Sequence, residues 1–122
     1  IFRGRVKIPV SIFEDLSPAE ALSKYLKENL GLRFSEIAKL INRDQRTVWL
    51  NYKNSSDKKI SIKKNSISVS VEIFFNRRLS ILESLVKHLK EKGFKNKAIA
   101  KMINQDQRVI ATLYSRVKKK LR

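Results

Sequence analysis

The residues with the clearest chemical potential form a Gln-Arg pair that occurs twice, as Gln45-Arg46 and Gln107-Arg108, each time directly after an aspartate. An Arg guanidinium can donate two parallel hydrogen bonds to guanine O6 and N7, and a Gln amide can pair with adenine N6 and N7. The residues that follow, Thr47 and Val109, could each contact a thymine methyl group. These two positions therefore indicate recognition of base edges in a DNA groove.

Residues suited to catalysis are scarce. The chain has no cysteine, and its one histidine, His88, stands where the first half of the chain has Tyr25 on a helical stripe. No second His and no paired carboxylates accompany His88 in a metal-binding or acid–base spacing. The three glycines, Gly4, Gly31 and Gly93, form no phosphate-binding loop. We therefore expect neither enzymatic activity nor a metal site, and no cofactor.

The overall charge points to an anionic partner. With 28 Lys and Arg residues against 11 Asp and Glu in 122 residues, the formal net charge is +17. Residues 1–61 carry 12 basic and 7 acidic groups, whereas residues 62–122 carry 16 and 4, so we expect the second half to bind DNA more strongly. No apolar run approaches the ~18–20 residues that cross a bilayer. We expect no membrane association, no small-molecule substrate and a cytoplasmic, nucleoid-associated location.

An internal repeat organises the chain. Residues 36–52 and 98–114 align without a gap and share nine of seventeen residues. Weaker matches continue upstream. The sequence therefore predicts two units, copy one (residues 1–57) and copy two (residues 58–122). Such a pair is equivalent to a dimer whose two subunits are joined in one chain. The expected fold is mainly α-helical with a small β-sheet, as two tandem pseudo-symmetric units of one strand and three helices. Self-association beyond this built-in pair stays open.

Each copy opens with alternating apolar residues, which predicts a half-buried strand over residues 6–12 and another over residues 67–73. Ile60 and Ile62 repeat the alternation briefly, so a hairpin could precede the second strand; the strands of the two copies could also pair with each other. Pro9 lacks an N–H group and places the first strand at an edge or near its end.

Helix signals follow in both copies. The Ser-x-x-Glu sequences that begin at Ser17 and Ser80 predict capping boxes, and Gly31 and Gly93 suit residues that end these first helices. Second helices are expected over residues 34–41 and 96–103. They end at breaks, residues 42–44 and 104–106, where Asn tolerates a left-handed backbone and Asp can cap a third helix.

The stretch from Gly31 to Trp49 resembles the helix-turn-helix of sigma factor region four, and residues 114–121 are similar to the end of that family's recognition helix. The resemblance covers about residues 16–54 and 79–121 but not the strands. It implies that residues 44–53 and about 106–118 are recognition helices that enter the major groove. Two features depart from the pattern: Arg33 and Lys95 stand where the family has a Ser or Thr cap, and Glu36 is replaced by Ala98.

The candidate DNA contacts fall into two groups. Base contacts are expected from the outward side of the third helices, at Gln45, Arg46, Thr47, Trp49, Gln107, Arg108, Ala111 and Thr112. Phosphate contacts are expected at Arg43, Lys53, Lys58, Lys59, Lys95, Lys97, Lys101, Arg116, Lys118 and Lys119. Trp49 has a second interpretation, which is packing against the other copy. Because the copies differ around Trp49, we expect an imperfect palindrome as the target.

The sequence thus predicts a sequence-specific double-stranded DNA-binding protein, employed as a transcription regulator. Two alternatives also bind DNA. One is an architectural or repeat-array protein of low specificity. The other is ribbon-helix-helix readout by polar strand residues, here Arg5, Lys7, Ser11, Ser68, Ser70 and Glu72. RNA binding is a weaker alternative, because the chain offers neither an exposed aromatic sheet nor a GXXG loop.

Overall fold

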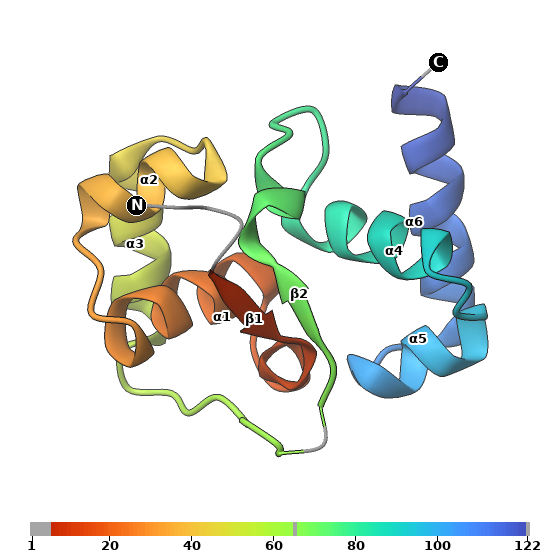
Figure 1. The fold of residues 1–122 in the computed structure, drawn as a ribbon, viewed down its shortest axis with the longest axis horizontal. Coiled ribbons are helices and arrows are strands. Elements are labelled where there is room, and N and C mark those ends of the chain that lie inside the picture. Colours follow the sequence, from red (N-terminus) through yellow and green to blue (C-terminus); the bar gives the residue numbers. More distant parts are fainter. Residues whose placement is uncertain (1–5, 65, 122) are drawn as a thin grey trace.

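The computed structural model describes residues 6–64 and 66–121, and Figure 1 shows the order of their elements. Within these residues the protein is mainly helical, with six α-helices and one small two-stranded antiparallel sheet, so the predicted fold class is confirmed. Copy one contains β1 (Lys7–Pro9), η2 (Val10–Phe13), α1 (Pro18–Lys24), η3 (Tyr25–Asn29), α2 (Phe34–Ile41) and α3 (Gln45–Ser55). Copy two contains β2 (Ser68–Ser70), η4 (Val71–Phe74), α4 (Ile81–Glu91), α5 (Asn96–Met102) and α6 (Gln107–Lys120).

The strands of the two copies pair with each other, which was one of the open alternatives. In the register of β1 with β2, Ile8 lies opposite Val69 and Lys7 lies opposite Ser70. When the copies are aligned so that Val10 corresponds to Val71, Ile8 corresponds to Val69. The central pair of the sheet is therefore formed by equivalent residues, and a pseudo-two-fold axis passes through it.

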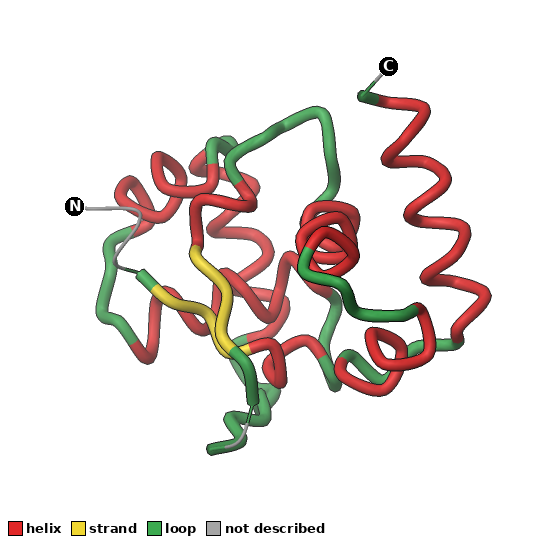
Figure 2. The backbone as a smooth tube through the Cα atoms, turned by 45° about the vertical axis from the view of Figure 1, so that its right-hand side comes forward, coloured by secondary structure: helices red, strands yellow, loops and turns green. Residues whose placement is uncertain are grey.

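Two backbone hydrogen bonds beyond the strands obey the same symmetry. Val10 N–H donates to the Ile67 carbonyl and Val71 N–H donates to the Val6 carbonyl, both at 2.9 Å. Figure 1 shows the result for the helices. On one flank of the sheet α3 runs from top to bottom, and on the other flank α6 runs from bottom to top. Figure 2 shows the paired strands between the helices of the two copies.

The strands are shorter than the alternation predicts. Each ends after three residues and continues as a 3-10 turn, η2 or η4. In copy one Val10, Ser11, Ile12 and Phe13 are all buried, so no solvent face is left there to require a strand, whereas the equivalent turn of copy two keeps Glu72 exposed. The predicted strands over residues 6–12 and 67–73 were thus wrong in extent. The hairpin at Ile60 and Ile62 was also wrong, because no strand occurs in described residues 56–64.

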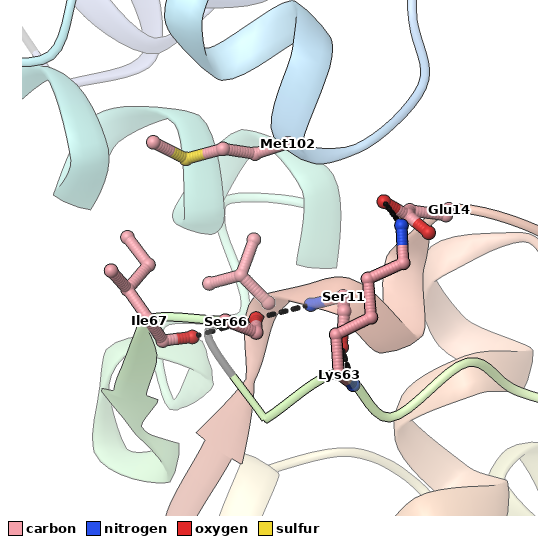
Figure 3. Close-up of a pocket in the computed structure, with 7 residues that line it drawn as sticks. Ser11, Glu14, Lys63, Ser66, Ile67 and Met102 are labelled. Atoms are coloured by element: carbon pink, nitrogen blue, oxygen red, sulfur yellow. Dashed lines mark hydrogen bonds and ion pairs between the residues drawn. The ribbon is translucent and has the colours of Figure 1, made fainter.

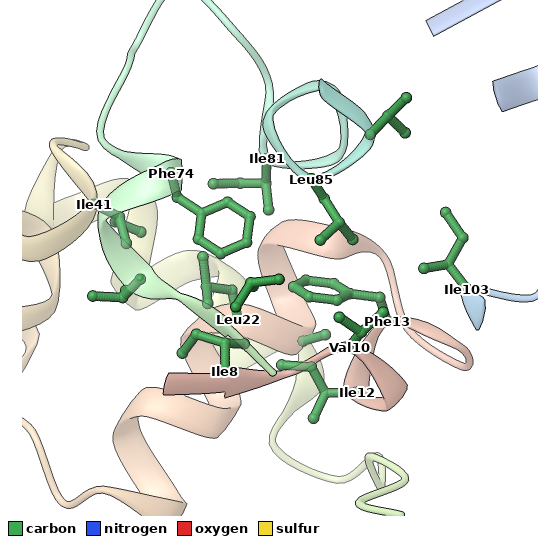
Figure 4. Packing of buried hydrophobic residues seen from close by; sticks show 14 of the residues in the cluster. Ile8, Val10, Ile12, Phe13, Leu22, Ile41, Phe74, Ile81, Leu85 and Ile103 are labelled. Carbon is green, nitrogen blue, oxygen red and sulfur yellow. The ribbon is translucent and has the colours of Figure 1, made fainter. Parts of the chain in front are cut away.

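One hydrophobic core serves both copies. The rings of Phe13 and Phe74, which correspond to each other, lie 6.0 Å apart, and Leu22 and Leu85 are fully buried beside them (Figure 4). Burying a side chain of this size contributes roughly 1.5–3 kcal/mol. The boundary between residues 57 and 58 falls in the linker after α3, and the two units share their interior instead of each forming a separate one.

The predicted stop signals are confirmed. Gly31 and Gly93 have φ angles of 66° and 96°, and Asn42 and Asn104 have φ angles of 53° and 54°. These are left-handed conformations, which Gly adopts without strain and Asn tolerates better than most residues. Both breaks before the third helices therefore have the backbone geometry that the sequence indicates.

Only one of the two predicted capping boxes forms. Ser80 Oγ accepts a hydrogen bond from Glu83 N–H at 3.1 Å, and Glu83 Oε1 accepts one from Ser80 N–H at 2.9 Å. Ser17 precedes α1 as expected but makes no side-chain capping bond, so the prediction of a capping box at Ser17 was wrong. Its intended partner Glu20 instead lies 3.7 Å from Lys58 Nζ.

The same ion pair occurs in both copies. Lys58 and Lys120 correspond to each other, and each pairs with the equivalent glutamate of the first helix, Lys120 with Glu83 at 2.7 Å. Glu83 is buried, and burial pushes its pKa upward. The Lys120 ammonium and the Ser80 N–H group outweigh that effect and hold the pKa below its usual range. These pairs fasten the segment just after α3 to α1, and the end of α6 to α4.

Arg43 makes contacts that its counterpart in copy two does not repeat. The Arg43 guanidinium donates to four backbone carbonyl oxygens, those of Ile41 (2.8 Å), Asn42 (3.3 Å), Phe74 (3.2 Å) and Leu79 (2.8 Å). Burial, and then the charge of nearby Arg77, lower the pKa of Arg43. Copy two has Gln105 at the equivalent place, and Gln105 is exposed. The turn of copy one is therefore bound to copy two, whereas the turn of copy two has no such anchor.

We expect Arg43→Gln to lower the free energy of unfolding by about 1–3 kcal/mol, because carbonyl groups at the interface between the copies lose their donors. Urea denaturation measures this. The matched variant Gln105→Ala should stay within about 0.5 kcal/mol of the wild type, because that position is exposed. Equal effects of the two substitutions would contradict the anchoring role of Arg43.

Stability should also fall on acidification in a way that depends on Glu83. A carboxyl whose folded pKa is depressed stabilises the fold above its unfolded pKa of about 4.3, and this contribution disappears as the pH falls through the folded pKa. We expect Glu83→Gln to reduce the difference between unfolding free energies at neutral and acidic pH. The exposed Glu72→Gln should leave that difference as in the wild type.

Candidate functional site

In each copy the second and third helices are joined by a short turn. In copy one, α2 buries Ile37, Leu40 and Ile41, the left-handed Asn42 reverses the chain, and α3 starts after Asp44. Val48 anchors α3 in the core with 1% of its surface exposed. Copy two repeats the arrangement with α5, Asn104, Asp106 and α6.

Aspartate caps hold the first turn of each third helix. Asp44 Oδ1 accepts a hydrogen bond from Arg46 N–H at 2.8 Å, and Asp106 Oδ1 accepts one from Arg108 N–H at 2.7 Å. The bonds satisfy backbone donors that a helix start leaves unpaired. Each Gln-Arg pair is therefore displayed from an ordered helix start and not from a loose loop.

The exposed sides of α3 and α6 carry all the predicted base-contacting residues. Gln45, Arg46, Thr47, Trp49, Gln107, Arg108, Ala111 and Thr112 are all exposed, as is Val109. The opposite sides hold the helices to the core through buried residues, which are Val48 in α3 and Ile110, Leu113 and Val117 in α6. The structure thus brings the Gln-Arg pairs onto one solvent face of each copy.

Sequence reasoning missed Leu50. It lies in α3 with 43% of its surface exposed, next to Trp49 at 42%. The signal was available, because Leu50 aligns with Thr112, which the sequence had already indicated as a base contact. The sequence analysis assigned Leu50 to neither side of this helix, and the structure places it on the exposed side.

The structure leaves Trp49 in solvent, so packing against copy two was the wrong one of its two interpretations. Lys53 Nζ lies 4.9 Å from the centre of the Trp49 ring, a cation–π distance. Trp49 lines a hollow of about 380 Å³ with Phe34, Gln45 and Arg46. An equivalent hollow of about 290 Å³ in copy two is lined by Asn96, Asp106, Gln107, Arg108 and Ala111. Both copies thus present a concave surface beside the first turn of the third helix.

Nine of the ten predicted phosphate-contacting residues are exposed: Lys53, Lys58, Lys59, Lys95, Lys97, Lys101, Arg116, Lys118 and Lys119. Lys58 Nζ forms an ion pair with Glu20 at 3.7 Å, and Lys118 Nζ lies 4.7 Å from the centre of the Tyr114 ring. Arg43 is the correction. Its guanidinium is turned toward the carbonyl groups at the interface between the copies, so we remove it from the candidate surface.

Another hollow, of about 250 Å³, lies between the linker and α5 (Figure 3). The Glu14 carboxylate and the Lys63 ammonium pair with each other at 2.9 Å, and Ser11 N–H donates to Ser66 Oγ at 2.9 Å. Met102 covers the far side. The polar groups are thus engaged in fastening the linker to the start of copy one.

The described residues offer no obvious site for other chemistry. In them no three His, Cys, Asp or Glu side chains converge to hold a metal ion. His88 is half-buried on α4, where burial, followed by the charge of Lys92, lowers its pKa. Over the same described ranges no helix combines the length and the apolar character needed to cross a bilayer.

Comparison with known protein families, with curated proteins and with solved structures finds no match for this chain. The resemblance to sigma factor region four therefore stays a prediction.

We expect Asp44→Ala and Asp106→Ala each to lower the free energy of unfolding by about 0.5–2 kcal/mol, because each removes the bond that caps a third helix. Chemical denaturation measures the change. Asp57→Ala, which lies beyond the end of α3, is the control and should have little effect. Loss of stability as large in Asp57→Ala as in the cap variants would count against the capping role.

Proposed function

We propose that this protein binds double-stranded DNA in a sequence-specific manner and regulates transcription. The single observation that carries the proposal is a pair of equivalent helices, α3 and α6, on either side of a pseudo-two-fold axis. Each begins with an exposed Gln-Arg pair held by an aspartate cap. The resemblance to sigma factor region four supports the same assignment.

The axis determines the form of the target. Dimeric helix-turn-helix proteins place two recognition helices in successive major grooves, about 34–36 Å apart, and their sites are palindromic because the proteins are symmetric. Here the equivalent helices belong to one chain and differ in sequence. Thr47 and Trp49 in copy one correspond to Val109 and Ala111 in copy two. The expected DNA target is therefore an inverted repeat whose two halves differ in sequence.

The charge of the chain supplies the sequence-independent part of binding. A net charge of +17 and nine exposed Lys and Arg residues among the candidates suit contacts with phosphates. Such contacts place a protein on DNA and make affinity fall with salt. Base contacts from α3 and α6 would add the preference for one sequence.

The ribbon-helix-helix alternative has less support. Each strand has only three residues. Ser11 is buried, and its hydroxyl donates to the Ser61 carbonyl at 2.8 Å, so it is engaged inside the protein. Arg5, another strand candidate, lies outside the described residues. This reading also leaves the exposed faces of α3 and α6 without a use.

Selection of bound duplexes from a random DNA pool tests the proposal. We expect one two-part, imperfectly symmetric site, bound ~10³-fold or more in preference to scrambled DNA. Arg46→Ala and Arg108→Ala should each weaken specific binding by about 1–3 kcal/mol and relax the preference in one half of the site. Lys92→Ala, on an exposed position at the end of α4, serves as the control.

Equal affinity for every duplex, in the wild type and in both Arg variants, would overturn sequence-specific binding. It would leave the architectural alternative. Preference for single-stranded or structured RNA over all duplexes would overturn DNA binding altogether.

A further inference from the structure

The exposed faces of α3 and α6 differ in a regular way. Side chains four residues apart share a helix face. Along that face copy one carries Arg46, Leu50 and Asn54, and copy two carries Arg108, Thr112 and Arg116. The first residue is the same in both, and the later ones are apolar or neutral in copy one and polar or basic in copy two. The two faces are therefore suited to different contacts.

Copy one presents apolar surface. Trp49 and Leu50 are adjacent, with 42% and 43% of their surfaces exposed. Both are large apolar side chains on the outside of α3, whereas copy two has Ala111 and Thr112 at these positions and exposes the smaller Val109 with 38% of its surface. In the major groove, thymine methyl groups are the apolar features that such side chains can contact. Copy one is therefore equipped to discriminate between bases.

Copy two presents charge on a longer helix. Arg116, Lys118 and Lys119 are exposed where copy one has Asn54, Ser56 and Asp57. The end of α6 is held in place, because Lys120 pairs with Glu83 and the Lys120 carbonyl accepts a hydrogen bond from Arg78. An ordered run of cations beyond the base-contacting turns is suited to phosphates, which carry no sequence information.

The turns before the third helices also differ between the copies. Arg43 binds the turn of copy one to the carbonyl groups of Phe74 and Leu79, and Gln105 in copy two is exposed. Discrimination between bases needs side chains held close to one geometry. A general attraction to phosphates tolerates more freedom. Copy one, which exposes Trp49 and Leu50, is thus the copy whose turn is held in place by Arg43.

We propose that the two copies divide the work of DNA recognition. Beyond the Gln-Arg pair that both copies share, copy one adds discrimination of bases through Trp49 and Leu50, and copy two adds salt-dependent affinity through Arg116, Lys118 and Lys119. This inference rests on the proposed DNA binding and assigns unequal roles to its two halves.

Exchanging residues between the copies tests discrimination. The variant W49A/L50T gives copy one the residues of copy two at exposed positions. We expect the selected site to become more symmetric, with the preference in the copy-one half reduced by about tenfold. The reverse variant A111W/T112L should transfer the copy-one preference to the other half. Thermal unfolding checks that both variants keep their fold.

Neutralisation tests affinity. The variant R116N/K118S/K119S should weaken binding to all duplexes alike, and the slope of log K against log salt should become shallower by about 0.9 for each lost phosphate contact. The control K64S/K87S/K92S removes the same number of charges from the linker and α4. We expect it to change the slope by less than about one contact.

The outcomes separate the two proposals. If the wild type selects no site, the proposed function fails. If the wild type selects a two-part site and W49A/L50T selects the same unlike halves, the division of work is overturned while DNA binding stands. The division is also overturned if the α6 variant and its control have equal salt slopes.

Discussion

The structure depends on the pairing of Ile8 with Val69. Because these residues are equivalent in the two copies, their pairing places the pseudo-two-fold axis and with it the relation of copy one to copy two. Both side chains are buried, and a slip of one residue in the register would turn each of them to the other face of the sheet. The same slip would separate Phe13 from Phe74. Three-residue strands are thus sufficient, because the shared core enforces their register.

Some contacts repeat in both copies and others occur in one copy only. The ion pairs Glu20–Lys58 and Glu83–Lys120 repeat, as do the aspartate caps, because both copies must hold a third helix in the same place. The Arg43 anchor does not repeat. Exposed positions after the shared Gln-Arg pairs also differ, as at Trp49 against Ala111 and Leu50 against Thr112. A single chain can carry this asymmetry, whereas two identical subunits cannot.

Helix ends were predictable because their causes are local. Gly31, Asn42 and Asp44 act on backbone groups within a few residues of themselves, so the sequence predicted the limits of α2 and the start of α3. The length of β1 was not predictable, because the four residues after it are all buried and lack the solvent face that alternation assumes. Arg43 was misassigned for a similar reason. Its carbonyl partners Phe74 and Leu79 are distant in sequence and give no local signal.

The sequence by itself determined the repeat, the excess of positive charge and the capped Gln-Arg pairs. These follow from residue identity and from interactions that span a turn of helix. Only the tertiary structure decided where the pseudo-two-fold axis lies, that Arg43 faces inward and that Trp49 and Leu50 face solvent. Whether a side chain is covered depends on segments far away in the chain, and their approach is set by packing around Ile8 and Val69.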